Sequence, residues 1–187
     1  QLDRAADCCR TALRLQPHGV DAINTLGLIA LARGRSDEAV ARFREALRLK
    51  PDHALACNNL GNALRLSGDL DGADTHFRRA AEIAPDLAEA HSNLGQLLLE
   101  RHQPHAALAY LRIAVRLRPD LAEARNNLGN ALRETGRLAE ARQSYAEALR
   151  INPNLAMTYN NMGQALQEEN VLDDSRAWYQ RALELDP

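Results

Sequence analysis

The chain has 187 residues, with 23 Lys and Arg against 25 Asp and Glu and a formal net charge of −2. This balance argues against a general polyanion binder, and no apolar run approaches the roughly 20 residues that a membrane-spanning helix needs. Aromatic residues make up only 4% of the chain, so we expect repeated elements that pack through short Ala and Leu side chains rather than one bulky core.

The sequence repeats at a fixed interval of 34 residues. Three sets of landmarks keep this step without a slip. The first is a set of prolines, the second a Leu-Gly or Met-Gly pair, and the third a set of alanines. They are Pro17, Pro51, Pro85, Pro119, Pro153 and Pro187; Gly27, Gly61, Gly95, Gly129 and Gly163; and Ala46, Ala80, Ala114, Ala148 and Ala182. A fixed period of this length indicates a stacked array of identical supersecondary units.

In chain order, the pattern predicts one lone helix and then five helix pairs. The lone helix covers about Leu2 to Leu15, within residues 1–19, and the pairs occupy 20–53, 54–87, 88–121, 122–155 and 156–187. In the fourth pair, apolar spacing predicts a first helix over Ala122 to Glu134 and a second over Leu138 to Asn152. Gly129 lacks a side chain where these two helices would cross closely, and Pro153 blocks continuation of the second.

The turn inside each pair has its own signal. A residue suited to a left-handed backbone follows each first helix: Gly34, Gly68 and Gly136, then His102 and Asn170 in the third and fifth pairs. Asparagine tolerates that conformation better than histidine. We therefore expect the turn at His102, with Pro104 behind it, to differ locally in shape.

These spacings resemble the tetratricopeptide repeat (TPR) family over the whole chain. The resemblance implies an all-α fold, a right-handed superhelix of helix-turn-helix units forming a single array over 1–187. It also implies that the first helix of each unit lines a concave groove that binds other proteins.

Primary amides cluster around the landmark glycine of each first helix. They stand three residues before it, two before it and one after it, and two arginines stand four after it. The predicted peptide-binding residues are Asn24, Asn58, Asn126 and Asn160; Asn59, Asn93, Asn127 and Asn161; Asn62, Gln96, Asn130 and Gln164; and Arg65 and Arg133.

This amide ladder (the twelve amides just given) suits an extended peptide, because a primary amide can both donate to and accept from a ligand backbone. The alternative is that some of these residues form hydrogen bonds between helices instead. Around the ladder, the first two repeats present Leu28, Leu31, Leu55 and Leu66, whereas later repeats add glutamates. A partner with an apolar segment leading into a basic or mixed one would fit, and so would a merely solvated charged face.

Several functions are disfavoured. The chain has no phosphate loop, nucleophile elbow, HExxH or paired-cysteine zinc motif, so we expect no enzyme activity and no cofactor. His102 and His105 lack a nearby third ligand, which makes a metal site unconvincing. Arginines of the second helices are interrupted by glutamates and lack stacking aromatics, which argues against nucleic acid. TPR receptors for chaperone tails hold a terminal carboxylate with cationic side chains. Glu123 and Asn127 occupy the slots where those cations would be expected, which argues against this kind of carboxylate binding.

Cys9 and Cys57 fall in core slots and Cys8 does not, so we expect buried free thiols, a reducing compartment and a cytoplasmic location. The chain starts in mid-repeat, which suggests an internal fragment.

Two narrower hypotheses remain open. The runs around Gly61 and Gly129 are similar to repeats of O-GlcNAc-transferase-type proteins, which implies a substrate-recruiting arm. Exposed apolar ends could also stack the array end to end into a self-associating scaffold.

Overall fold

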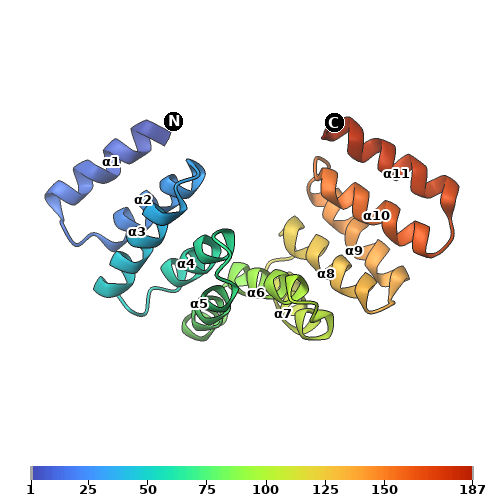
Figure 1. Ribbon diagram of the computed structural model, residues 1–187, viewed down its shortest axis with the longest axis horizontal. Coiled ribbons are helices and arrows are strands. Elements are labelled where there is room, and N and C mark those ends of the chain that lie inside the picture. Colours follow the sequence, from blue (N-terminus) through green and yellow to red (C-terminus); the bar gives the residue numbers. More distant parts are fainter. Residues whose placement is uncertain (1, 187) are drawn as a thin grey trace. The chain divides into compact units, whose positions relative to one another are not determined.

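The computed structural model describes residues 2–186, and within them the helices are joined by short turns and no strand is present (Figure 1). The helices are α1 Leu2–Leu15, α2 Val20–Ala32, α3 Ser36–Leu49, α4 Ala54–Leu66, α5 Leu70–Ile83, α6 Ala88–Glu100, α7 Pro104–Leu117, α8 Ala122–Glu134, α9 Leu138–Ile151, α10 Ala156–Glu168 and α11 Leu172–Leu185. These bounds confirm the predicted all-α class and the pairing of helices. Pro187, the last of the spaced prolines, lies outside the described residues.

The chain divides into two compact units, residues 1–93 and 94–187, and α6 spans the division. In the first unit, α1 packs against α2, α2 against α3, α3 against α4 and α4 against α5. In the second unit, α7 packs against α8, α8 against α9, α9 against α10 and α10 against α11. Each helix therefore packs on its successor within these runs. The assignment of one continuous array over 1–187 stays a prediction.

The landmark glycine of each first helix lies against a large side chain of its partner helix. A Cβ built on Gly27 would lie 2.5 Å from Cε1 of Phe43, and one built on Gly129 would lie 2.3 Å from Cε1 of Tyr145. Both rings are 0% exposed. The predicted close crossing at Gly129 is confirmed, and the ring 16 residues later fills the space that the missing side chain leaves.

Alanines join each repeat to the next in the first unit. Ala46 of α3 clusters with Ile23 of α2 and Ala56 of α4, and all three are buried. One repeat later, Ala80 of α5 clusters with Cys57 of α4 and Ala90 of α6. An alanine of the second helix thus meets a small residue of the following first helix, which allows close helix packing.

The turn slots adopt the expected left-handed backbone. The φ angles are 71°, 86° and 75° at Gly34, Gly68 and Gly136, and 56° and 64° at His102 and Asn170. The expectation that the His102 turn differs in shape is wrong. His102 N–H donates to Leu99 C=O and Gln103 N–H to Leu98 C=O, the same pair of bonds that closes α2 at Gly34. These two bonds satisfy orphan carbonyls and hold the histidine in a conformation that costs energy.

The cysteines divide by burial. Cys57 is buried, as predicted, and burial raises the pKa of its thiol. Cys8 is exposed and Cys9 is only half-buried, which corrects the expectation of a buried core residue at Cys9. The reason lies in α1, where Ala6 is the buried residue, so this helix contributes little to the core.

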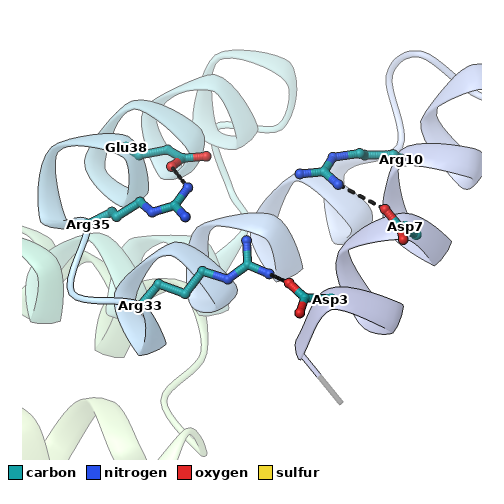
Figure 2. A network of polar contacts seen from close by, with 6 residues as sticks. All are labelled: Asp3, Asp7, Arg10, Arg33, Arg35 and Glu38. Atoms are coloured by element: carbon teal, nitrogen blue, oxygen red, sulfur yellow. Dashed lines mark hydrogen bonds and ion pairs between the residues drawn. The ribbon is translucent and has the colours of Figure 1, made fainter.

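Several ion pairs lie at the start of the first unit (Figure 2). Arg33, just after the end of α2, bonds the carboxylate of Asp3 on α1, and Arg10 bonds Asp7 within α1 at 2.9 Å. Asp3 and Asp7 are exposed, so pairs of this kind contribute little to stability.

No helix of the described residues is both long enough and apolar enough to cross a membrane.

Candidate functional site

Three of the four amides that stand three residues before a landmark glycine are buried links between repeats: Asn24, Asn58 and Asn126. Asn24 and Asn58 are 7% and 5% exposed in the first unit. Oδ1 of Asn24 accepts a hydrogen bond of 3.0 Å from Nδ2 of Asn59 on the following first helix, and Oδ1 of Asn58 accepts one of 2.9 Å from Nδ2 of Asn93. The two bonded asparagines are 35 residues apart in each case. Because the repeat is 34 residues long, the donor lies one position further along its repeat than the acceptor does.

The second unit repeats this link with an added donor. Oδ1 of Asn126 accepts from Nδ2 of Asn161 at 2.9 Å and from the hydroxyl of Thr158 at 3.0 Å. Asn126, Asn161 and Thr158 are 5%, 7% and 1% exposed. One buried carboxamide oxygen therefore holds two buried donors of α10, and Asn126 also donates to Oδ1 of Asn127 at 3.4 Å.

Linked amides of this kind favour the alternative in which part of the ladder is structural. Asn24, Asn58, Asn126 and Asn161 are buried, so a ligand could reach them only by displacing a bond between helices. Each such neutral bond contributes about 0.5–1.5 kcal/mol net, and an unpaired buried partner costs more. These residues fix the position of each first helix against the next.

A second set of amides stays half-exposed. Among the described residues 2–186, Asn62, Asn160 and Gln164 form no hydrogen bond within the chain. Asn130 and Gln96 are also half-exposed, but Oδ1 of Asn130 accepts from the hydroxyl of Tyr145 at 2.8 Å and Nε2 of Gln96 donates to Glu100 at 3.4 Å. The structure thus separates the predicted site into buried links and accessible amides on the same first helices.

A polar depression lies on α8 and α10 of the second unit, lined by Arg133, Gln164, Gln167 and Glu168. Nη1 of Arg133 contacts Oε1 of Glu168 at 2.6 Å. Burial alone lowers the pKa of Arg133, but its bonds to Glu168 and Tyr145 outweigh that effect and raise it. The guanidinium therefore stays charged beside the accessible amide of Gln164.

The phenol of Tyr145 interacts with Arg133, one of the residues that line this depression. Its ring is fully buried, and burial raises the pKa of Tyr145 to about 12, although the neighbouring Arg133 acts to lower it. The neutral hydroxyl donates to Asn130, which orients that amide.

The first helices of the first unit carry exposed apolar side chains instead. Leu28 on α2 is 43% exposed, and Leu55 and Leu66 on α4 are 50% and 63% exposed. Leu31 and Arg65 are half-buried. The predicted apolar character of the first two repeats is thus present at the surface.

Sequence reasoning missed Thr158 and the role of the Tyr145 hydroxyl. The signal for Thr158 was available, because the same slot holds Ala22, Ala56, Ala90 and Ala124 in the other repeats. A hydroxyl in a slot otherwise filled by alanine needs a buried acceptor. For metals, no group of three His, Cys, Asp or Glu residues within the described part of the chain could hold an ion.

Comparison with family models matches almost the whole sequence. A model described as tetratricopeptide repeat matches residues 1–41, 24–88 and 92–156, and a second model of the same description matches 155–185. No curated protein matches the chain.

Solved structures share the fold. PilF of Pseudomonas aeruginosa is 26% identical with a TM-score of 0.81, covering 90% of this chain and 77% of PilF. YrrB, a TPR protein with an unusual peptide-binding site, is 23% identical with a TM-score of 0.72, covering 97% of this chain and 94% of YrrB. The Cut9–Hcn1 tetramer of the APC/C gives a TM-score of 0.90 at 18% identity, covering 100% of this chain and 37% of that one.

These matches do not show the resemblance to O-GlcNAc-transferase-type arrays, which stays a prediction. They agree with the helix pairs, the left-handed turns and the glycine crossings described above. The chain belongs to the tetratricopeptide repeat family, whose fold is a protein–protein interaction fold.

Proposed function

We propose that the chain binds an extended segment of a partner protein along the accessible surface of its first helices. The observation that carries this proposal is the set of half-exposed amides without a partner in the described chain, above all Asn62 and Gln164. A primary amide left open to solvent can donate to a ligand C=O and accept from a ligand N–H, whatever the ligand sequence. The buried links beneath hold the helices that carry these amides.

Each unit, taken by itself, offers different side-chain contacts to a bound segment. In the first unit, Leu28, Leu55 and Leu66 would bury apolar side chains of the ligand. In the second unit, Arg133 and Glu168 flank Gln164 and would accept a charged or mixed segment. Affinity from the amides alone is modest, since a few net hydrogen bonds offset little more than the ordering cost of the peptide. The side-chain contacts would therefore decide specificity.

YrrB, a TPR protein with a peptide-binding site, shares the fold of this chain at 23% identity, and a peptide ligand here would be in line with that likeness. Recruitment of protein substrates to a glycosyltransferase is a narrower version of the same proposal, and it rests only on the resemblance stated for the repeats around Gly61 and Gly129.

The test compares two double variants. Peptides are selected on the wild-type chain from a displayed library of random extended sequences, and their affinities are measured by fluorescence polarisation. Asn62→Ala with Gln164→Ala should weaken the selected peptides about fivefold or more, from the loss of about 1–3 kcal/mol. The matched control, Gln143→Ala with Gln180→Ala, removes two exposed amides from second helices and should change nothing. Equal binding by both variants, or the absence of any selected peptide, would refute the proposal.

A further inference from the structure

The carboxamide of Asn130 on α8 is held by a tyrosine of the partner helix α9. The hydroxyl of Tyr145 donates to Oδ1 of Asn130 at 2.8 Å. Nδ2 of the same amide has no partner within residues 2–186, and the residue is half-exposed. Because the oxygen and the nitrogen of a carboxamide point in different directions, an oxygen that faces the phenol leaves the amino group open to solvent.

The neighbours of the phenol decide which way this amide is turned. Arg133 also interacts with the oxygen of Tyr145. A guanidinium carries donors and no acceptor, so the phenol oxygen can only accept from it. The single proton of the hydroxyl is left for Asn130, and the amide has to present its oxygen to receive that proton. The donors of this network therefore fix the orientation of the amide.

The same contacts connect Asn130 to α10. Nη1 of Arg133 donates to Oε1 of Glu168 at 2.6 Å, which holds the guanidinium beside the phenol. Hydrogen bonds in a chain polarise one another, and here the chain begins at a cation. A guanidinium at the phenol oxygen makes the hydroxyl of Tyr145 a stronger donor, and this in turn makes the free N–H groups of Asn130 stronger donors.

The other repeats do not reproduce this arrangement. In the three earlier repeats, the slot of Tyr145 holds side chains without a hydroxyl: Phe43, Phe77 and Leu111. In the fifth repeat the hydroxyl of Tyr179 bonds Oε1 of Gln167 at 2.9 Å, and Gln167 does not belong to the amide ladder. Asn62, the counterpart of Asn130 in the first unit, therefore has no bond that turns its oxygen inward.

The charges at this phenol favour a neutral ligand group. Burial raises the pKa of Tyr145 most, Arg133 acts to lower it, and the carboxylates of Glu168 and Glu134 raise it further. Two carboxylates thus act on the same phenol as one guanidinium. A ligand carboxylate would add a third negative charge there, whereas a carbonyl oxygen accepts a hydrogen bond without adding one.

We propose that Asn130 selects a neutral carbonyl oxygen of the bound segment, and that Tyr145 is the residue that positions it. This inference rests on the proposed function and names the group that the second unit recognises. The amino group of Asn130 donates to that carbonyl, and Tyr145 acts only through the amide. In the first unit, Asn62 can turn either its oxygen or its amino group to a ligand.

The probe is a peptide selected on the wild-type chain from the displayed library and counter-selected against the Asn130→Ala variant. Each main-chain carbonyl of the peptide is replaced in turn by a thioamide, whose sulfur is a weaker acceptor, and each Asn or Gln side chain by alanine. One replacement should weaken binding to the wild type about fivefold and leave the weaker binding to Asn130→Ala unchanged, as a double-mutant cycle requires. Whether a thioamide or an alanine has this effect tells a main-chain carbonyl from a side-chain one.

Tyr145→Phe tests the positioning role, because it keeps the ring and removes the proton. With folding verified by circular dichroism, it should weaken the peptide about two- to threefold and reduce the effect of the sensitive replacement. In the free chain, NMR should show a lower order parameter for the Asn130 side-chain amide. Tyr159→Phe is the matched control, since it removes a hydroxyl of the same unit that bonds Pro153 C=O, and it should change neither result.

The outcomes separate this inference from the proposed function. If every selected peptide binds Asn130→Ala as tightly as the wild type, this inference is overturned and the proposed function stands. A peptide that reaches Asn130 through a carboxylate would overturn it as well. So would a Tyr145→Phe chain that keeps both the full effect of the sensitive replacement and the order parameter of the amide. Failure to select any peptide would refute the proposed function, and this inference with it.

Discussion

Replacing Asn126 with alanine tests whether the buried amides hold successive repeats together. Its Oδ1 is the shared acceptor for Asn161 and Thr158, both buried on α10. Removing it leaves two donors unsatisfied, and each such donor costs about 1–3 kcal/mol. We expect a loss of about 2–4 kcal/mol in the free energy of unfolding, since water can reach Asn161 in part.

Replacing Asn161 instead should cost much less. Asn126 Oδ1 then keeps its bond from Thr158, so only one net hydrogen bond of about 0.5–1.5 kcal/mol disappears. Asn160→Ala serves as the control, because Asn160 is half-exposed, forms no hydrogen bond within residues 2–186 and lies within α10 of the second unit. The gain in helix propensity from Asn to Ala is common to all three variants and cancels.

Urea unfolding followed by the fluorescence of Trp178, the single tryptophan, reports on the second unit. With a slope near 2 kcal/mol/M, Asn126→Ala should lower the midpoint by about 1–2 M. Circular dichroism shows in parallel whether the repeats unfold together, which an array of this kind does not guarantee. If Asn126→Ala costs no more than Asn161→Ala, the shared acceptor is not the stabilising feature and the reasoning fails.

Two further predictions concern the buried ring of Tyr145. Gly129→Ala should lower the free energy of unfolding by about 1–3 kcal/mol, because the new Cβ would lie 2.3 Å from that ring. Gly163→Ala is the control and should be close to neutral, since its Cβ would meet the half-buried ring of Tyr179 at 2.8 Å. Thermal melts in which both variants have the same midpoint would contradict this prediction. Since the folded pKa of Tyr145 is about 12 against about 10 when unfolded, its neutral form supplies stability that is complete below pH 10 and is lost as pH rises from 10 to 12. Urea midpoints across that range should fall more steeply for the wild type than for Tyr145→Phe, and parallel curves would count against a buried neutral phenol.

The fold was predictable because each of its main features depends on one residue type at one position of the 34-residue repeat. Gly129 and Gly136 each have one structural use, the first a close crossing and the second a left-handed turn. The turn at His102 was harder, since two backbone hydrogen bonds keep a conformation that its side chain disfavours. Local preference was overruled there by the geometry of the helix pair.

The division of the amide ladder could not be predicted from the sequence. The position three before each glycine and the position one after it differ by four residues, a rotation of only about 40° around the helix. Asn126 and Asn130 are the same residue type in adjacent directions, yet one is buried and the other half-exposed. Burial at that boundary depends on where the next first helix lies, and the period alone does not specify this.

The direction of the amide links bears on how such a chain lengthens. In each link described, the later helix donates and the earlier helix accepts. A segment of one period therefore brings along both an acceptor for the next repeat and a donor for the preceding repeat. Duplicating or deleting the period that carries Asn58 and Asn59 leaves no amide unmatched at the new junction, whereas the third repeat carries Ser92 in the acceptor slot. Gene-level expansion and contraction in whole periods would then carry little energetic penalty, whereas an insertion out of phase would break a link on each side.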